Sequence, residues 1–288
     1  MKAPDTTPTP TDTRDAGVRA FYNDLPFNYW SDTEQAAGTV RSNPLLAYPD
    51  LDDLLEHDPI REVLEIGCGA GWATNALALH YGVNVTAVDF TAAALARARD
   101  VAQALDLGDA VSFTECDLFR FATDKRFDLV QSIGVLHHTH DCRAAFAHAA
   151  SFVRPGGYLF VGLYHLYGRR PFLRLFHDIL RTEGEQAAFD RYAAMHHQSS
   201  DTTHVRSWFR DQVLHPQETQ HSLEEVMGWL NAEGFTLLST SINRYDDPTD
   251  RAALIAAEQA LEAVSERRNR IENDYFPGFF TVLAQRDD

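Results

Sequence analysis

The central part of the chain alternates between short apolar runs and longer amphipathic segments. Runs at 63–66, 83–88, 111–113, 127–132 and 158–163 have the length and composition of buried strands. Between them, apolar residues recur at helical spacing over 71–81, 91–105 and 142–153, and a Pro155-Gly156-Gly157 turn precedes the fifth strand. Strands that alternate with helices in this way predict right-handed βαβ units and a mostly parallel sheet.

The pattern changes after residue 164. Residues 165–220 lack strand signals and predict mostly helices. Ser222 followed by Glu225 is a capping box, which predicts a helix that runs to about Ala232 and stops at Gly234. A strand-like run at 235–242, a long helical pattern at 249–270 and a last strand at 279–284 complete the chain.

The N-terminal segment differs in composition from the rest. Residues 1–14 are rich in Thr, Pro and Asp and predict a disordered tail. Residues 15–60 contain many aromatic side chains, and we expect them to pack over the remainder as a lid. The chain thus divides into the tail (1–14), this lid (15–60), an α/β core (61–164), a helical insert (165–220) and a C-terminal part that completes the sheet (221–288).

A glycine-rich turn follows the first strand. Gly67, Gly69 and Gly71 stand between that strand and a helix, where they let the backbone turn tightly and approach a ligand. A dinucleotide fingerprint would need another glycine at 72, and that position is Trp72. Glu65, just before the turn, suits the ammonium group of a ligand and would repel a pyrophosphate.

Acidic residues follow the next two strands. Asp89 ends the second strand, where a carboxylate can accept both hydroxyls of a ribose, and the adjacent Phe90 can lie against an adenine face. Asp117 follows the third strand and could accept from an adenine amino group. Each acid alone could equally cap a helix or face solvent. Their order at successive strand ends predicts a nucleoside site at the carboxyl edge of the sheet.

Five segments together resemble a known family. VLEIGCGAGWAT, VTAVDF, ECDL, FDLVQSIGVLHHT and RPGGYLFVG, between Val63 and Leu163, are similar to the core of class I S-adenosylmethionine-dependent methyltransferases. The resemblance implies an α/β, Rossmann-like, mostly parallel seven-stranded sheet with an antiparallel last strand, here with a helical insert as a cap. It implies S-adenosyl-L-methionine as the cofactor and leaves the acceptor atom (O, N, C or S) open.

The resemblance also assigns roles to residues. The amino-acid part of the cofactor would be held by Glu65 and the turn, the ribose by Asp89, and the adenine by Phe90, Asp117 and Leu118. Aromatic residues of the lid could favour a sulfonium through cation–π contact. The full set of expected cofactor neighbours is Tyr29, Glu65, Gly67, Cys68, Gly69, Asp89, Phe90, Asp117, Leu118, Ile133 and His138.

Candidate catalytic residues follow the fourth and fifth strands and lie in the insert. His137 is expected to face the acceptor and could act as a general base if the acceptor loses a proton. Tyr164 and His215 would border the same space, together with 208–212. The alternative for 208–218 is cap structure whose polar groups satisfy one another.

Charge and composition limit the partners. The formal net charge of -17 argues against nucleic acid and anionic membranes and favours a small-molecule acceptor. No apolar run approaches the roughly 18 residues of a membrane span, and the N-terminus lacks a signal-peptide stretch, so we expect a cytoplasmic protein. The three cysteines form no CxxC pair and the histidines lack a carboxylate at ligand spacing, so no disulfide and no metal are expected. The 249–270 helix packs on its own domain or forms a homodimer.

Two rival functions remain. One is a nicotinamide-dependent oxidoreductase on a similar sheet, which Glu65 and the residue at position 72 disfavour. The other is a non-catalytic, cofactor-binding regulatory protein, which the presence of Glu65, Asp89 and Asp117 disfavours.

Overall fold

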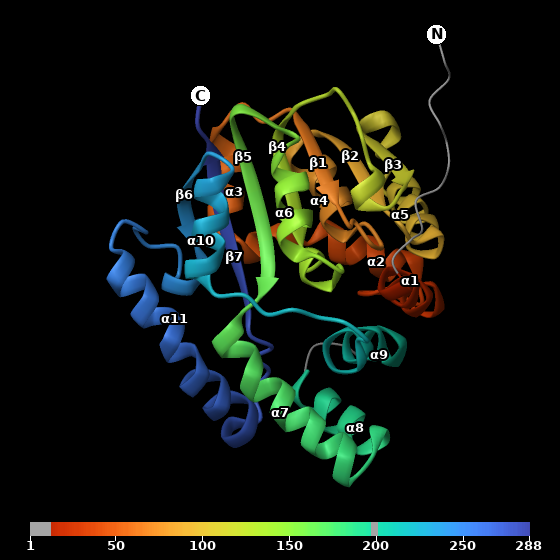
Figure 1. Cartoon of the computed structure of the whole chain (residues 1–288). Helices are drawn as coiled ribbons and strands as arrows, with labels where there is room; N and C mark the ends of the chain where they lie inside the picture. The colour runs from red at the N-terminus through yellow and green to blue at the C-terminus, as the bar shows by residue number, and fades with distance from the viewer. Residues whose placement is uncertain (1–12, 197–200) are drawn as a thin grey trace.

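A seven-stranded sheet in the order β3-β2-β1-β4-β5-β7-β6 forms the centre of the protein (Figure 1). The computed structural model describes residues 13–196 and 201–288. The strands are β1 (Glu62–Ile66), β2 (Asn84–Asp89), β3 (Val111–Glu115), β4 (Phe127–Ile133), β5 (Val153–Tyr164), β6 (Phe235–Thr240) and β7 (Phe279–Arg286). Strands β1 to β5 pair in parallel, and β7 is antiparallel to both β5 and β6. The predicted fold class, including the antiparallel last strand, is confirmed.

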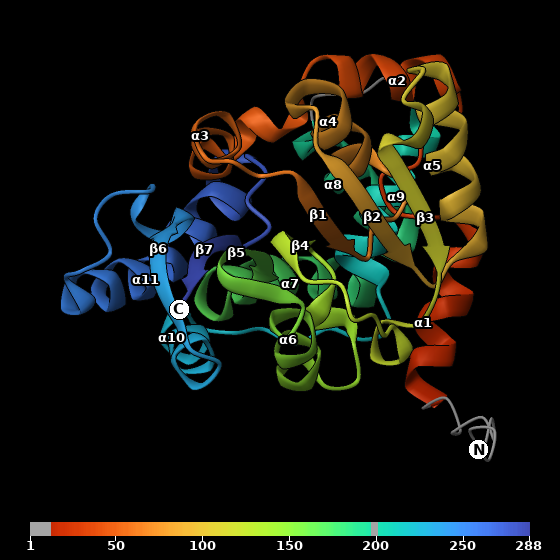
Figure 2. The ribbon, with the colours of Figure 1, turned by 90° about the horizontal axis from the view of Figure 1, so that it is seen from above.

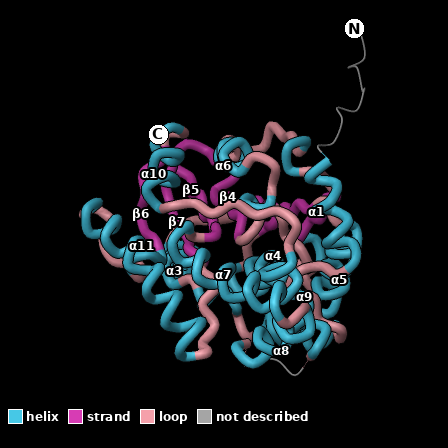
Figure 3. Tube along the Cα trace, turned by 60° about the horizontal axis from the view of Figure 1, so that its bottom comes forward, coloured by secondary structure: helices cyan, strands magenta, loops and turns pink. Residues whose placement is uncertain are grey.

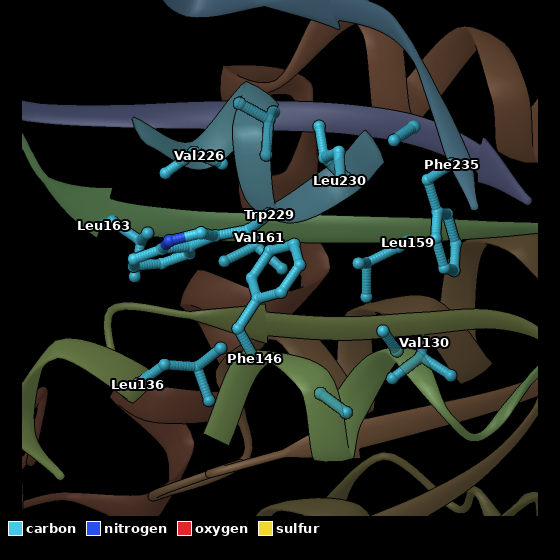
Figure 4. Packing of buried hydrophobic residues seen from close by; sticks show 14 of the residues in the cluster. Val130, Leu136, Phe146, Leu159, Val161, Leu163, Val226, Trp229, Leu230 and Phe235 are labelled. Atoms are coloured by element: carbon cyan, nitrogen blue, oxygen red, sulfur yellow. The ribbon is translucent and has the colours of Figure 1, made fainter. Parts of the chain in front are cut away.

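Helices cover both faces of the sheet, as its apolar central strands require (Figure 2). One face packs against α2 (Thr33–Arg41), α3 (Pro49–His57), α4 (Trp72–Tyr81) and α5 (Ala92–Ala104). The other packs against α6 (Cys142–Ala150), α10 (Leu223–Ala232) and α11 (Arg251–Glu266). On this second face Phe146 of α6 and Trp229 of α10 meet at 5.4 Å between ring centroids beside Val161 of β5 (Figure 4).

The two helices predicted near the C-terminus are present as α10 and α11. The Ser222 hydroxyl accepts from the Glu225 backbone N–H at 3.1 Å, and α10 ends shortly before Gly234, whose φ is +73°. The Glu225 carboxylate contacts Nδ1 of His221 at 3.0 Å and so leaves the capping box half formed. Helix α11 continues into a π-helical turn, η7 (Arg267–Glu272).

The predicted turn at Pro155–Gly157 is instead a bulge inside β5. Val153 already pairs with Phe127, and regular pairing resumes only at Tyr158 opposite Leu129. The Asp128 carboxylate accepts from Arg154 Nε at 2.7 Å and holds the displaced segment against the neighbouring strand. The sequence shows the residues of the bend, but the part of β5 before them is too short to give a strand pattern.

The insert lies beyond the carboxyl ends of the parallel strands (Figure 1), and α1 and Asn28 of the N-terminal segment contact it there. The rest of the segment predicted as a lid differs from the prediction, because α2 and α3 pack on a face of the sheet. The insert contains α7 (Leu166–Thr182), α8 (Glu185–Met195), α9 (Thr202–Phe209) and the π-helical turn η5 (Arg210–Leu214), with a small core of its own. Figures 1 and 3 both place α8 and α9 side by side. Trp208 of α9 donates to Asn28 Oδ1 at 3.0 Å, and Trp30 stacks on His204 at 3.9 Å. The insert is helical, as predicted.

The first helix, α1 (Thr13–Asp24), begins just before the predicted end of the tail. Residues 1–12, the rest of the segment predicted to be disordered, lie outside the described residues. The remaining short elements are η1 (Pro44–Ala47), η2 (Gly108–Ala110), η3 (Leu118–Arg120), η4 (Leu136–His138) and η6 (Ser241–Asn243). In the described part of the chain, no helix combines the length and apolarity that a membrane span needs.

A buried arginine ties the insert to the sheet. The Arg169 side chain on α7 is fully buried and donates through Nε and Nη2 to both Glu218 carboxylate oxygens, at 3.0 and 2.6 Å. Nη2 also donates to the Gln212 carbonyl at 2.6 Å, and Nη1 to the Pro277 carbonyl at 3.2 Å. The guanidinium therefore joins α7, η5, the segment before α10 and the segment before β7.

This junction leaves no room for a side chain at Gly278. A Cβ there would lie 2.2 Å from the Arg169 backbone nitrogen, and φ at Gly278 is +70°. We expect Gly278→Ala to lower the free energy of unfolding by about 3 kcal/mol or more through strain and displaced backbone. Chemical denaturation measures the loss.

Gly228→Ala is the matched control, because Gly228 lies inside α10 with open space around it. It should raise the free energy of unfolding by about 0.5–1 kcal/mol, through helix propensity. Equal effects of the two substitutions would contradict the close approach at Gly278.

Candidate active site

A pocket opens where the strands β1 to β4 end. Its empty space is about 990 Å³, with the open solvent at its mouth included. The core contributes the turn after β1, the ends of β2 and β4, and the loop after β3, and the lid and insert close the other side. The lining residues are Val18, Tyr22, Pro26, Phe27, Ile66, Gly67, Cys68, Gly69, Ala70, Trp72, Val88, Asp89, Phe90, Thr91, Ala94, Cys116, Asp117, Leu118, Phe119, Ile133, Gly134, Val135, His138, Thr139 and Asp211.

The glycine turn is packed too closely for side chains at its start. The Gly67 backbone N–H donates to the Val88 carbonyl at 2.7 Å, and φ at Gly67 is +76°. A Cβ at Gly67 would lie 2.4 Å from a methyl group of Val135. The turn therefore forms a bare backbone wall of the pocket between β1, β2 and β4.

Asp89 holds the glycine turn in place and also lines the pocket. Its carboxylate accepts from the Gly69 N–H at 2.9 Å and from the Thr91 N–H at 2.8 Å, which fixes the turn to the end of β2. Burial raises the pKa of Asp89 although both hydrogen bonds oppose the shift. Each carboxylate oxygen can accept more than one hydrogen bond, so Asp89 can still accept from a ligand in the pocket.

The adenine end expected from the sequence lies beside Asp117. The Asp117 carboxylate accepts from the Phe119 N–H at 2.9 Å, so it caps η3 while it also lines the pocket. Phe90, Leu118 and Phe119 provide apolar surface around it. The sequence left open whether Asp117 caps a helix or lines a pocket, and in the structure it does both.

Glu65 lies beneath the glycine turn and is not among the lining residues. Its side chain is 3% exposed, and the Thr74 hydroxyl donates to it. Burial raises the pKa of Glu65 to about 7. Its contact with a ligand ammonium stays a prediction.

Tyr29 is turned away from the pocket. Its hydroxyl accepts from Arg97 Nη2 at 2.7 Å, and its backbone N–H donates to Ser207 at 3.1 Å. The lid instead presents Tyr22 and Phe27 to the pocket. Which aromatic residue of this segment faces inward depends on how α1 docks, and the sequence does not encode that as a local pattern.

The three predicted catalytic residues lie behind the pocket wall. His137 is fully buried, with its ring 4.0 Å from that of Tyr164, and His138 rather than His137 borders the cavity. The expectation that His137 faces the acceptor therefore differs from the structure, because the 3-10 turn η4 directs it inward. The His215 ring is tilted against that of His138, with 3.7 Å between the ring centroids. Catalytic roles for His137, Tyr164 and His215 stay predictions, and their positions support only indirect ones.

Asp211 is a lining residue that the sequence did not single out. Its Oδ1 accepts from the Tyr22 hydroxyl at 2.5 Å, and its Oδ2 accepts from the Tyr164 hydroxyl at 3.2 Å. The sequence marked 208–212 as pocket or cap, but only the π-helical turn η5 directs Asp211 inward. The Tyr22–Asp211 contact joins the lid to the insert across the pocket.

The pocket wall carries acids and no basic counterpart. Asp89, Asp117 and Asp211 line it, and none of the described lining residues is Lys or Arg. Such a wall suits a ligand with positively charged groups, such as a sulfonium and an ammonium. It does not suit the pyrophosphate of a dinucleotide, which needs donors and positive charge.

Part of the chain is similar to known proteins. Residues 63–157 match a family model described as a methyltransferase domain. An uncharacterised protein of Synechococcus is 29% identical over 200 residues, which cover 62% of this chain and 48% of that protein. A ubiquinone biosynthesis O-methyltransferase of Coxiella burnetii is 29% identical over 143 residues, covering 49% of this chain and 58% of that enzyme. The matches thus span about half the length of these curated relatives.

Solved structures share the fold over most of the chain. Magnesium protoporphyrin IX methyltransferase from Synechocystis, crystallised with S-adenosylmethionine, has a TM-score of 0.53 at 16% identity and covers 98% of this chain and 100% of that one. PKMT2 from Rickettsia typhi, in complex with S-adenosylhomocysteine, has a TM-score of 0.56 at 15% identity. The match covers 82% of this chain and 50% of that one. Residues 63–157 thus match a methyltransferase domain, as the motifs indicated, and the solved structures show the fold that the resemblance implied.

The raised pKa of Glu65 predicts a dependence of stability on pH. Its folded pKa is about 7 against 4.5 for the free group, so the folded state binds the extra proton between these values. The free energy of unfolding should therefore fall by at most about 3 kcal/mol, through Glu65 alone, as the pH rises from about 4.5 to 7.5. Glu65→Gln should remove that loss.

Denaturation of both forms across this range, without ligand, measures the difference between them. The comparison cancels the buried histidines, whose lowered pKa values act in the opposite direction. A difference between the two forms that is independent of pH would show that folding does not raise the pKa of Glu65.

Proposed function

We propose that this protein is an S-adenosylmethionine-dependent methyltransferase that acts on a small-molecule acceptor. One observation carries the proposal: the bare glycine turn, Asp89 and Asp117 line one pocket, in sequence order, at the carboxyl ends of β1, β2 and β3. The backbone of the turn would hold the amino-acid part of the donor, the Asp89 carboxylate its ribose, and Asp117 with the apolar surface around it its adenine. The matched family model supports the same assignment.

The donor supplies an already activated methyl group on its sulfonium. The protein's own part is therefore to hold the donor and the acceptor in line and to keep water away. Gly69 and Asp89 are positioned to orient the donor, since their mutual hydrogen bond fixes both. Tyr22 and Phe27 of the lid and Asp211 of the insert close the side opposite the turn.

A small acceptor is favoured by this closure and by the charge. The pocket is covered by the lid and the insert, which join through Tyr22 and Asp211, so an acceptor must fit beneath them. The formal net charge of -17 disfavours nucleic acid. Homodimerisation through α11 stays a prediction; in this chain α11 packs on α7 and α10.

Calorimetric titration with S-adenosylmethionine and S-adenosylhomocysteine tests the proposal. Both should bind, and Asp89→Asn should weaken both at least about tenfold, because a carboxylate–hydroxyl pair contributes about 1.5 kcal/mol or more. Asp109→Asn, at an exposed aspartate of η2, should leave both affinities unchanged. No binding to the folded wild-type protein would overturn the cofactor assignment.

Two further arms separate the rival functions. Titration with NADH should give no binding, and binding of NADH in place of S-adenosylmethionine would favour an oxidoreductase. Incubation with methyl-labelled S-adenosylmethionine and a small-molecule cell extract should yield a labelled product. Cofactor binding without any labelled product would favour the non-catalytic alternative.

A further inference from the structure

Asp211 places a buried negative charge at the wall of the pocket. It is 5% exposed and lines the cavity. Three neutral groups donate to its oxygens: the Tyr22 hydroxyl at 2.5 Å, the Tyr164 hydroxyl at 3.2 Å and the Gln212 side-chain amide at 3.4 Å. The two hydroxyls favour the ionised carboxylate, although burial raises the pKa of Asp211. The carboxylate is thus held by hydrogen bonds from groups that carry no positive charge.

The charged groups around Asp211 leave its charge uncompensated. Arg169 forms a buried ion pair with Glu218 at 2.6 Å, and these two charges largely cancel. Burial lowers the pKa of His138 to about 4 and that of His215 to about 3, so both rings are neutral at pH 7. Of this set, Asp211 provides the net charge beside the cavity.

The polar side chains next to Asp211 direct their polar atoms into the protein. His138 Nδ1 lies 2.8 Å from the Gln217 carbonyl oxygen, and its Nε2 is a buried atom. The Thr139 hydroxyl donates to the Leu136 carbonyl at 2.7 Å. His138 is the one histidine among the described lining residues, so a nucleophile in the cavity meets the face of its ring and no imidazole nitrogen.

A site of this kind selects a nucleophile by its charge. A hydroxyl must lose a proton as it is methylated, and so needs a base. An aliphatic amine is protonated at neutral pH and needs a base for the same reason. An anion such as a carboxylate or a phosphate would be repelled by Asp211. A nitrogen that is neutral at pH 7, with its lone pair free, meets none of these obstacles.

We propose that the methyl acceptor carries a neutral nitrogen on an apolar ring, as an aromatic amine or a nitrogen heterocycle does, and that Asp211 stabilises the cation formed by its methylation. The inference rests on the proposed function. The apolar ring follows from Val18, Pro26 and Phe27, which line the pocket on the lid side. The fixed carboxylate lies where positive charge would develop on the acceptor, and such preorganised charge lowers the barrier.

The step balances without another reactant. The lone pair of the acceptor nitrogen forms the bond to the methyl carbon. The electron pair of the broken carbon–sulfur bond stays on sulfur, which becomes a neutral thioether. The positive charge thereby passes from sulfur to nitrogen and remains in the pocket, and no proton moves. An aromatic amine gives an anilinium product, which loses its proton to water after release.

A competition between quinoline and 1-naphthol tests the inference without knowledge of the natural acceptor. The two molecules are similar in size and differ in the nucleophile, a neutral ring nitrogen or a hydroxyl. With methyl-labelled S-adenosylmethionine and equal concentrations of both, quinoline should be methylated at least about tenfold faster. Methylation of naphthol at an equal or higher rate, or of neither molecule, overturns the inference.

The pH dependence of the quinoline reaction gives a readout that a protein base would change. At saturating S-adenosylmethionine, the rate should vary by less than about twofold between pH 7 and pH 9, because the nitrogen is neutral throughout and transfers no proton. A rate that rises with pH to a plateau would show that a basic group takes part, and would contradict the proposed step.

The role of Asp211 is tested by the binding of N-methylquinolinium and 1-methylnaphthalene, which have the same shape and differ in the positive charge. Measured by calorimetry on the protein saturated with S-adenosylhomocysteine, Asp211→Asn should weaken the cation about tenfold and the hydrocarbon less than about twofold. Equal effects on the two ligands overturn the role of Asp211. The quinoline competition needs no variant, so it decides the acceptor class even if Asp211→Asn does not fold.

Asp178→Asn is the matched control, because Asp178 is another aspartate of the insert and its side chain is 56% exposed. It should leave the affinities for both ligands unchanged, and an effect equal to that of Asp211→Asn would show that the cation responds only to the overall charge. The S-adenosylhomocysteine titration is read first, and its failure counts against the proposed function. The two isosteric ligands are then compared on the free protein.

Discussion

The buried charge of Arg169 is the constraint on which the side of the pocket formed by the insert depends. A guanidinium cannot be buried without close partners, and here the partners come from three separate segments outside α7. Nη2 holds the Gln212 carbonyl, and this fixes the π-helical turn in which the preceding residue, Asp211, faces the cavity. The guanidinium also lies 3.8 Å from the Tyr164 ring centroid, and the Tyr164 hydroxyl reaches Asp211. One ion pair thereby orients the polar end of the pocket.

The two halves of the pocket have different structural origins. The half proposed to hold the donor, the donor half, is made of strand ends and a tight turn, which the hydrogen bonds of the central sheet hold in place. The half proposed to hold the acceptor, the acceptor half, is made of side chains from α1, η4 and η5, held by the buried polar cluster around Arg169 and Asp211. Changes in the insert can therefore alter the acceptor half while the turn between β1 and α4 keeps its geometry.

The sequence predicted which strand ends line the pocket because those signals are local. The turn at Gly67–Gly71 and the acids Asp89 and Asp117 directly follow strands, so their positions come from the topology of a parallel sheet. The acceptor half depends on contacts between residues far apart in the chain, such as Tyr22 with Asp211. No periodicity fixes how α1 docks, so the sequence does not show which aromatic residue of the lid lines the pocket: Tyr29 was expected as the cofactor neighbour, and Tyr22 lines the pocket. Likewise, adjacent histidines differ only by the rotation of a 3-10 turn, and the sequence does not show which of the two borders the cavity.

The first helix has no backbone pairing with the sheet. Side-chain contacts attach it, among them Tyr22 with Asp211, Arg210 with Asp24 and Arg19 with Glu115. Of these, the Arg19–Glu115 and Arg210–Asp24 pairs are exposed to solvent. Segments held in this way open at a lower free energy than the strands of a core. The amide protons of α1 should therefore exchange with solvent well before those of β1 and β4, and a ligand enclosed beneath α1 would be retained for a time set by this local opening.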